Sequence, residues 1–147
     1  MLDYEESVAV VSQIANSSPL SEQNVATIVE EWRNEDGTRN PCLEGGEIAR
    51  TIASYVLQDD LSSIEQTFET VEGLLSSLDI WGVSFIATCF LEALDTEIDT
   101  SCKRVRDGQE RRRQCENALA RIMGRETYAR WQQLSTFNLN PPIGESR

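Results

Sequence analysis

Hydrophobic and polar positions along this chain repeat every three to four residues, which is the period of an α-helix. The pattern covers most of residues 3–137, and no segment shows the strict alternation that is typical of a β-strand. We therefore predict an all-α fold.

The densest apolar segment is 79–95, where hydrophobic side chains occupy nearly the whole circumference of the predicted helix. Its polar positions fall on one narrow stripe: Ser84, Thr88, Glu92 and Asp95. A helix that is apolar nearly all round is typical of a buried position. The apolar run is shorter than the roughly 20 residues that a membrane-spanning helix needs, and Glu92 interrupts it. We therefore expect a central core helix and no membrane partner.

Further helical segments are predicted to pack around this central helix. They are 3–16, 19–33, 43–57, 61–78, a segment through Leu119–Met123, and 125–137. The result would be about seven helices in antiparallel pairs, as a bundle or a short HEAT-like superhelix. The length of 147 residues fits a single helical domain, 1–140. Pro141-Pro142 then marks the start of a flexible tail, 141–147.

Residues that favour helix ends give the predicted boundaries. Asp3 is the predicted N-cap of the first helix, and Ser18 that of the second, with Pro19 in its first turn. Residues 34–41 are rich in loop-forming side chains and predict a long loop. Gly124 is expected to end the sixth helix in the left-handed conformation.

Charge is distributed unevenly along the chain. The formal net charge is −12, yet residues 1–100 hold 20 acidic and 3 basic side chains, while residues 101–147 hold 5 acidic and 10 basic ones. An acidic body disfavours nucleic acid and anionic membranes, because phosphates are bound by Lys and Arg. It favours a basic protein partner, or serves only for solubility. The first residues, Met1–Glu6, are acidic and do not resemble the basic and then apolar start of a secretory signal peptide. We therefore expect a cytoplasmic protein.

The residue types that carry most enzyme chemistry are missing or scattered. The chain has no histidine, which removes the usual general base and the usual zinc ligand. Gly45-Gly46 lacks the lysine and the preceding strand of a phosphate-binding loop. Glu92 is the one carboxylate whose setting points to a perturbed pKa, although it would equally accept a hydrogen bond from the basic segment or face water. We predict no catalytic activity, no cofactor and no metal site.

The four cysteines make no metal-binding motif, because no two of them are two residues apart. Cys89 lies inside the central helix and is interpreted as a small core residue. Cys102 and Cys115 flank the basic segment, so a disulfide between them is one alternative. In a reducing cytosol we expect free thiols instead.

Residues 97–117 concentrate basic side chains and contain hardly any apolar ones. A nucleic-acid site of this kind would need interleaved aromatic residues, which the segment lacks. We expect its arginines to lie against the acidic helices of the same chain.

Several short stretches, taken in order, resemble a family of small all-helical bacterial domains. They are Pro41 followed by Gly45–Ala49, then Phe90–Leu94, Met123–Glu126 and Trp131–Leu134. Members of that family resemble immunity-type proteins, which are encoded beside secreted toxins and each bind and block one cognate toxin. The likeness covers roughly residues 20–137, and it supplies no catalytic residue. The basic segment 97–117 departs from the family, whose corresponding stretch is shorter.

The resemblance implies a monomeric, cytoplasmic immunity protein that binds a cognate toxin or another basic protein and occludes the toxin's active site. The alternative is a helical adaptor or scaffold without a toxin. The expected partner-binding residues are acids near helix ends and loops: Glu30, Glu31, Glu35 and Asp36 around the long loop, and Asp95, Glu97 and Asp99 after the central helix. A further acidic edge, formed by Glu65, Glu69 and Glu72, is expected to face solvent.

Overall fold

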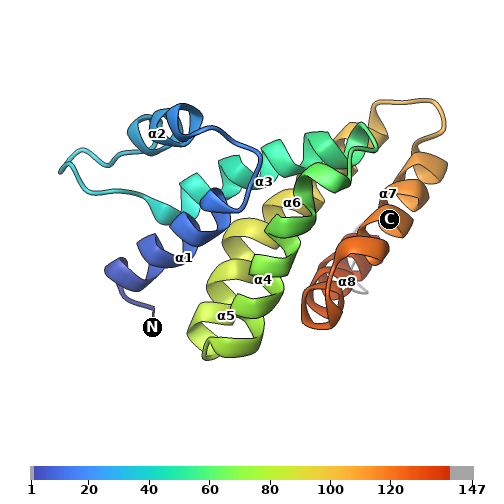
Figure 1. Cartoon of the computed structure of the whole chain (residues 1–147). Coiled ribbons are helices and arrows are strands. Elements are labelled where there is room, and N and C mark those ends of the chain that lie inside the picture. The colour runs from blue at the N-terminus through green and yellow to red at the C-terminus, as the bar shows by residue number, and fades with distance from the viewer. Residues whose placement is uncertain (1, 140–147) are drawn as a thin grey trace, which may run out of the picture.

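The computed structural model describes residues 2–139, with side chains up to residue 134, and it confirms the all-α prediction. Within that range the chain forms helices joined by short connections (Figure 1). The elements are α1 (Tyr4–Asn16), α2 (Glu22–Glu31), α3 (Pro41–Leu57), the 3₁₀ turn η1 (Ser62–Ile64), α4 (Glu65–Ser77), α5 (Ile80–Ile86), the π-helical segment η2 (Ala87–Leu91), α6 (Glu92–Lys103), α7 (Gly108–Ile122) and α8 (Arg125–Leu139). The predicted tail, 141–147, and the side chain of Phe137 lie outside the described residues.

The segments α5, η2 and α6 follow one another without a break and form the central rod of the fold. The rod starts where the sequence predicts but runs beyond Asp95 to Lys103. Helix α3 packs along it at close range, and a Cβ atom on Gly45 would lie only 3.3 Å from the carbonyl oxygen of Cys89. Gly45 is therefore a packing feature, because a side chain there would press on the backbone of the rod, whereas a Cβ atom on Gly46 would make only ordinary contacts.

The core lies where α1, α3, α4 and the rod meet. Phe90 of η2 is 1% exposed and meets Phe68 of α4 edge-on, with ring centroids 6.5 Å apart. Leu119 of α7 and Trp131 of α8 are buried against the same core. Figure 1 shows α1 and α2 on one side of the pair formed by α4 and the rod, and α7 and α8 on the other. None of the helices in residues 2–139 has both the length and the apolar character that crossing a membrane requires.

The predicted start of α1 is correct, but that of α2 is wrong. Asp3 is the N-cap of α1, and its carboxylate accepts a backbone N–H three residues on at 2.8 Å. Ser18 and Pro19 precede α2 without starting it. The N-cap is Ser21, whose hydroxyl accepts the N–H of Asn24 at 3.1 Å. Both serines suit an N-cap by residue type, so the local sequence alone could not distinguish them.

The predicted left-handed turn at Gly124 is also wrong. Gly124 does not have a positive φ. Helix α7 ends at Ile122, and the C-cap residue Met123 is extended. A Cβ atom on Gly124 would lie 2.4 Å from the side chain of Glu72, which would have to move away. The reason for this glycine is therefore a tertiary contact and not a turn.

The prediction that the central helix is buried all round fails at its first turn. Ile80 is 73% exposed and Trp81 is 55% exposed. Farther along, the polar stripe does not behave as a unit, because Glu92 faces solvent whereas Asp95 is completely buried. The reason is packing: the rod is covered by other helices in its middle and at Asp95, but its first turn projects beyond them.

The expectation of free thiols is confirmed for Cys102 and Cys115, but the interpretation of Cys89 as a simple core residue missed a disulfide. Cys89 of η2 forms a disulfide with Cys42 of α3, with the two Cα atoms 4.9 Å apart. Cys102 and Cys115 are buried and free, so the alternative of a disulfide between them is not realised. The Cys42–Cys89 bond fixes the first turn of α3 to the middle of the rod.

Candidate protein-interaction surface

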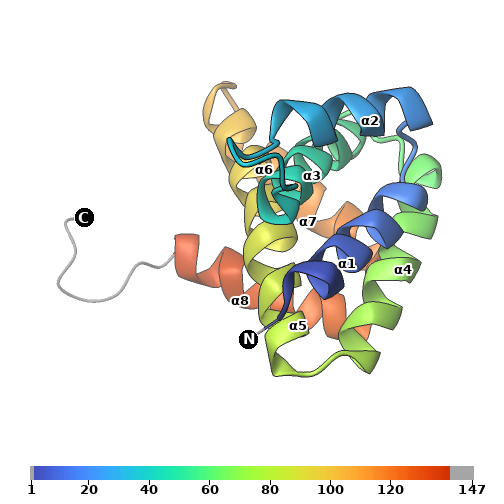
Figure 2. The ribbon, with the colours of Figure 1, turned by 90° about the vertical axis from the view of Figure 1, so that its left-hand side faces the viewer.

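Helix α2 and the loop after it stand at the edge of the molecule, as two perpendicular views show (Figures 1 and 2). Ile28 is the one residue of this helix that is fully buried. The helix is therefore held by few apolar contacts and turns most of its surface to solvent. We name the exposed carboxylates of this region the acidic α2 surface: Glu22, Glu30, Glu31, Glu35 and Asp36.

The loop between α2 and α3 is ordered by its own side chains. Asn34 Nδ2 donates to Thr38 Oγ1 at 3.0 Å, and Asp36 Oδ1 accepts from the Thr38 backbone N–H at 2.9 Å and from its hydroxyl at 2.6 Å. Gly37, with φ at 88°, lets the chain reverse direction. The backbone of the loop and the carboxylate of Asp36 are therefore held in place, which lowers the entropy lost on binding a partner.

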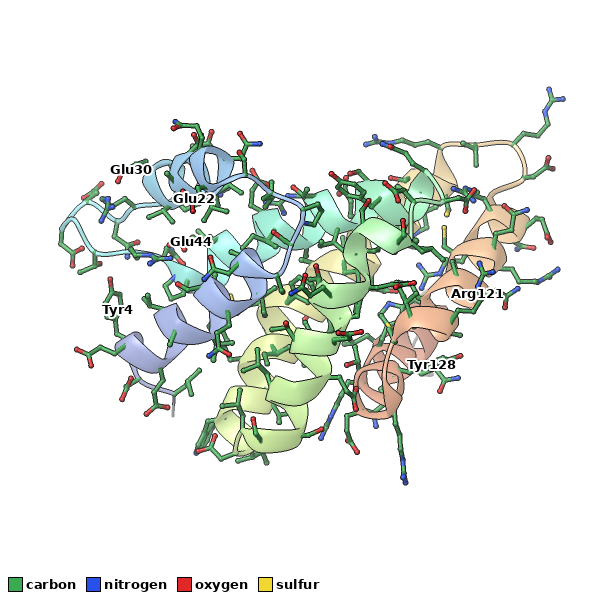
Figure 3. The ribbon with its side chains drawn as sticks, viewed as in Figure 1. Tyr4, Glu22, Glu30, Glu44, Arg121 and Tyr128 are labelled. Atoms are coloured by element: carbon green, nitrogen blue, oxygen red, sulfur yellow. A yellow bond between two sulfur atoms is a disulfide. The ribbon has the colours of Figure 1, made fainter. Side chains whose placement is uncertain are left out.

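The end of this loop is anchored to α1 and α3. Arg39 pairs with the buried carboxylate of Glu44 at 2.6 Å, and its backbone N–H donates to the hydroxyl of Tyr4 at 3.0 Å. Figure 3 shows Glu22 and Glu30 on the outer helix, with Glu44 and Tyr4 beneath them. The disulfide at Cys42 follows within the first turn of α3. The base of the loop is thus rigid.

The carboxylates of the acidic α2 surface differ in how free they are. Glu30 pairs with Arg33 at 2.6 Å, and the hydrogen bond from this guanidinium lowers the pKa of Glu30. The hydrogen bonds from Thr38 likewise lower the pKa of Asp36, so both carboxylates are charged at neutral pH. Glu31 and Glu35 form no ion pair with any side chain among the described residues. Glu22 is likewise exposed and forms no ion pair within residues 2–134, so the charges of these three side chains are open to a partner.

The second predicted cluster, after the central helix, is not a surface of this kind. Asp95 is 0% exposed, and its Oδ1 lies 2.5 Å from Arg112 Nη2, so the expectation that it is presented to a partner is wrong. Asp99 is paired with Lys103 at 2.8 Å, and Glu97 is half-buried. The physical reason is that α6 continues past Asp95 and α7 packs against it, which brings Arg112 to the carboxylate.

Arg112 lies at the centre of a buried network between α6, α7 and α8. Besides Asp95 it contacts Glu116 at 3.2 Å, and its guanidinium carbon lies 5.7 Å from the ring centroid of Trp131. Burial acts to lower the pKa of Arg112, but the carboxylates of Asp95 and Glu116 outweigh it and raise the pKa. The arginine is therefore a charged structural link between three helices.

The prediction that the basic segment lies against acidic helices of the same chain is confirmed for two of its arginines. Arg112 pairs with Asp95 as described, and Arg111 lies 3.8 Å from Asp59 and donates to the carbonyl of Leu57. Arg113 instead pairs within its own helix, with Glu110 at 2.8 Å.

A hollow of about 880 Å³ lies at the turn between α6 and α7. Its lining mixes charges of both signs, such as Lys103 and Glu110, with the thiol of Cys102. Burial raises the pKa of the neighbouring Cys115 to about 11, so this thiol is protonated at neutral pH. In the part of the chain that the structure describes, no three Cys, Asp or Glu side chains are grouped so as to hold a metal ion.

Sequence reasoning missed the role of Glu72. We expected it to face solvent with Glu65 and Glu69, and only those two are exposed. The carboxylate of Glu72 accepts the backbone N–H groups of Glu126 at 3.0 Å and Thr127 at 2.9 Å, and thus caps the start of α8. No local signal could reveal this contact, because it joins residues 54 positions apart.

Comparison with known proteins adds no relative: no family model fits the chain, and neither a curated protein nor a solved structure matches it. The likeness to immunity-type proteins therefore rests on the short stretches of sequence described above.

Proposed function

We propose that this protein binds and neutralises a basic cognate toxin, in the manner of an immunity protein, and that it catalyses no reaction itself. The observation that supports the proposal best is the acidic α2 surface, in which carboxylates are presented on an ordered loop. A toxin whose active site is a cationic cleft, such as a nuclease, would be occluded by this surface.

The charge pattern favours a basic partner over other classes. Residues 1–32 contain no Lys or Arg, so α1 and α2 carry only acidic charges. Complementary charge raises the association rate with a basic protein and repels nucleic acid. Glu31 and Glu35 form no ion pair within residues 2–134, so a basic partner can pair with them without breaking an ion pair inside the protein.

The test is co-purification with the product of the neighbouring gene, followed by an assay of that product's toxic activity. The decisive variant is the double substitution Glu31→Lys with Glu35→Lys, which should weaken inhibition and leave the helical circular dichroism spectrum unchanged. The matched control is Glu65→Lys with Glu69→Lys, which reverses two exposed charges on α4 and should leave inhibition intact.

The outcomes separate the immunity function from its alternative. If the neighbouring product neither binds nor is inhibited, the immunity function is rejected. If it binds but keeps its full activity, the protein is a helical adaptor.

The proposed function and the disulfide predict different compartments for this protein. An immunity protein of this kind would act in the cytoplasm, yet the Cys42–Cys89 disulfide is typical of an oxidising compartment. Alkylation of accessible thiols in intact cells, followed by mass spectrometry, tests this point. Reduced Cys42 and Cys89 would support the cytoplasm, and a complete disulfide would place the protein in an oxidising compartment.

A further inference from the structure

The first turn of α5 exposes two large apolar side chains next to each other. Ile80 is 73% exposed and Trp81 is 55% exposed, although the rest of the central rod is largely covered. Trp is one of the residue types that most often dominate the binding energy of a protein interface. In Figures 1 and 2 this turn forms a corner of the molecule, well away from α2.

The backbone that carries these side chains is rigid. Asp79 Oδ1 accepts the backbone N–H groups of Trp81 at 3.1 Å and Gly82 at 3.0 Å. Leu78 folds over Gly82 so closely that a Cβ atom there would lie 2.7 Å from the Cβ of Leu78. The tight connection from α4 thus fixes the backbone that exposes Ile80 and Trp81, so this backbone needs no further ordering when a partner binds.

The charged side chains on the helices at this corner are all acidic. Figure 2 shows the first turn of α1 near that of α5. The pKa of Glu6 is raised mainly by the side chain of Asp3, and to a lesser degree by the charge of Asp79. Helix α4 packs against both α1 and α5, and none of these three helices contains Lys or Arg. An apolar pair on helices that carry acidic side chains and no Lys or Arg is complementary to a basic surface that also carries apolar side chains.

We propose that this corner is a second interaction surface, the α5 anchor, formed by Ile80 and Trp81 with Asp3, Glu6 and Asp79 around them. Its partner is a basic protein segment with exposed apolar side chains. A second copy of this chain does not fit, because two acidic corners repel each other, and anionic lipid is repelled for the same reason. The inference rests on the proposed function in one respect only: the natural protein that carries this basic segment would be the toxin.

The test uses a synthetic probe and does not need the toxin. The probe is an amphipathic helical peptide with leucine on one face and lysine on the other, labelled for fluorescence anisotropy. Two matched peptides replace lysine by glutamate or leucine by serine. The protein variants are Trp81→Ser and Ile80→Ser, and the control is Val105→Ser, which removes another exposed apolar side chain, from the turn between α6 and α7.

We expect the lysine–leucine peptide to bind the native protein and to shift the emission of Trp81 to shorter wavelength, a change that Trp81→Phe removes. Trp81→Ser and Ile80→Ser should each weaken binding by about tenfold or more, the usual effect at the centre of an interface. Val105→Ser should bind like the native protein, and both matched peptides should bind at least about tenfold more weakly.

The inference is overturned if the lysine–leucine peptide fails to bind, or if it binds all three serine variants equally. It is also overturned if Trp81 emission shifts with protein concentration alone, which would identify a second copy as the occupant, or on addition of zwitterionic lipid vesicles. Failure of this test leaves the acidic α2 surface untouched, just as failed co-purification with the neighbouring product leaves the α5 anchor untouched.

Discussion

At the scale of single residues, the buried pair of Asp95 and Arg112 carries a stability prediction. Arg112→Met leaves the Asp95 carboxylate buried without its closest cation, and breaking a buried pair in this way costs roughly 3–5 kcal/mol. Urea unfolding measures the loss. The neighbouring substitution Arg113→Met is the control, because it removes only an exposed pair with Glu110 and should cost less than about 1 kcal/mol. Equal losses for the two variants would show that the buried network does not join the helices.

Phe90 provides the corresponding test of the apolar core. It is 1% exposed and packs edge-on against Phe68, so Phe90→Ala should reduce the free energy of unfolding by roughly 3–5 kcal/mol. Val105→Ala, at an exposed position, should stay within about 0.5 kcal/mol of the native protein. A loss below about 1 kcal/mol for Phe90→Ala would mean that the rod is not the centre of the fold.

At the scale of elements, Glu72 links α4 to the start of α8. Burial acts to raise the pKa of Glu72, but the hydrogen bonds from the Thr127 and Glu126 N–H groups outweigh it and lower the pKa below its ordinary value of 4.5. A lowered folded-state pKa contributes stability above the ordinary value, and this contribution is lost as the pH falls through the lowered one. Unfolding free energies as a function of pH should show this loss.

The variant Glu72→Ala isolates that contribution. It should cost roughly 0.5–2 kcal/mol at neutral pH, the range for removing a helix N-cap, and the cost should disappear in acid. Glu69→Ala, one turn earlier and exposed, should have no such effect. A pH-independent difference between Glu72→Ala and the native protein would exclude the capping carboxylate as its source.

The disulfide between α3 and the rod gives a second prediction for the elements. It joins residues 47 positions apart, and closing a loop of this length in the unfolded chain is worth roughly 4 kcal/mol. A reducing agent should therefore lower the melting temperature of the native protein, but not that of the double variant Cys42→Ser with Cys89→Ser. An unchanged melting temperature for the native protein would restore the expectation of free thiols.

The elements also show what the sequence could and could not predict. Helical periodicity located α1, α3 and the rod, because a buried face such as that containing Phe90 and Leu94 repeats along the chain. The Cys42–Cys89 bond, the Glu72 cap and the burial of Asp95 depend on contacts between residues far apart in sequence, which no local pattern records. For the candidate site, the loop carboxylates are exposed as predicted, whereas Asp95 was predicted to be exposed and is buried.

At the scale of the whole molecule, the two charge regions are combined in one fold without cancelling each other. The basic C-terminal part uses Arg111 and Arg112 against Asp59 and Asp95, while Arg113 pairs within α7. None of these cations reaches α1 or α2, whose carboxylates keep a negative surface. Because exposed charges add little to stability, that surface can be reversed by mutation without unfolding the protein.

The association rate of this protein with the proposed toxin partner, measured at low and high salt, tests the central claim most directly. The account predicts fast association at low salt that slows as salt is added, since steering between opposite charges is screened. Glu31→Lys with Glu35→Lys should slow association by about tenfold at low salt and converge on the native rate at high salt, with little change in dissociation. Association rates that are independent of salt and equal for both proteins would contradict the account.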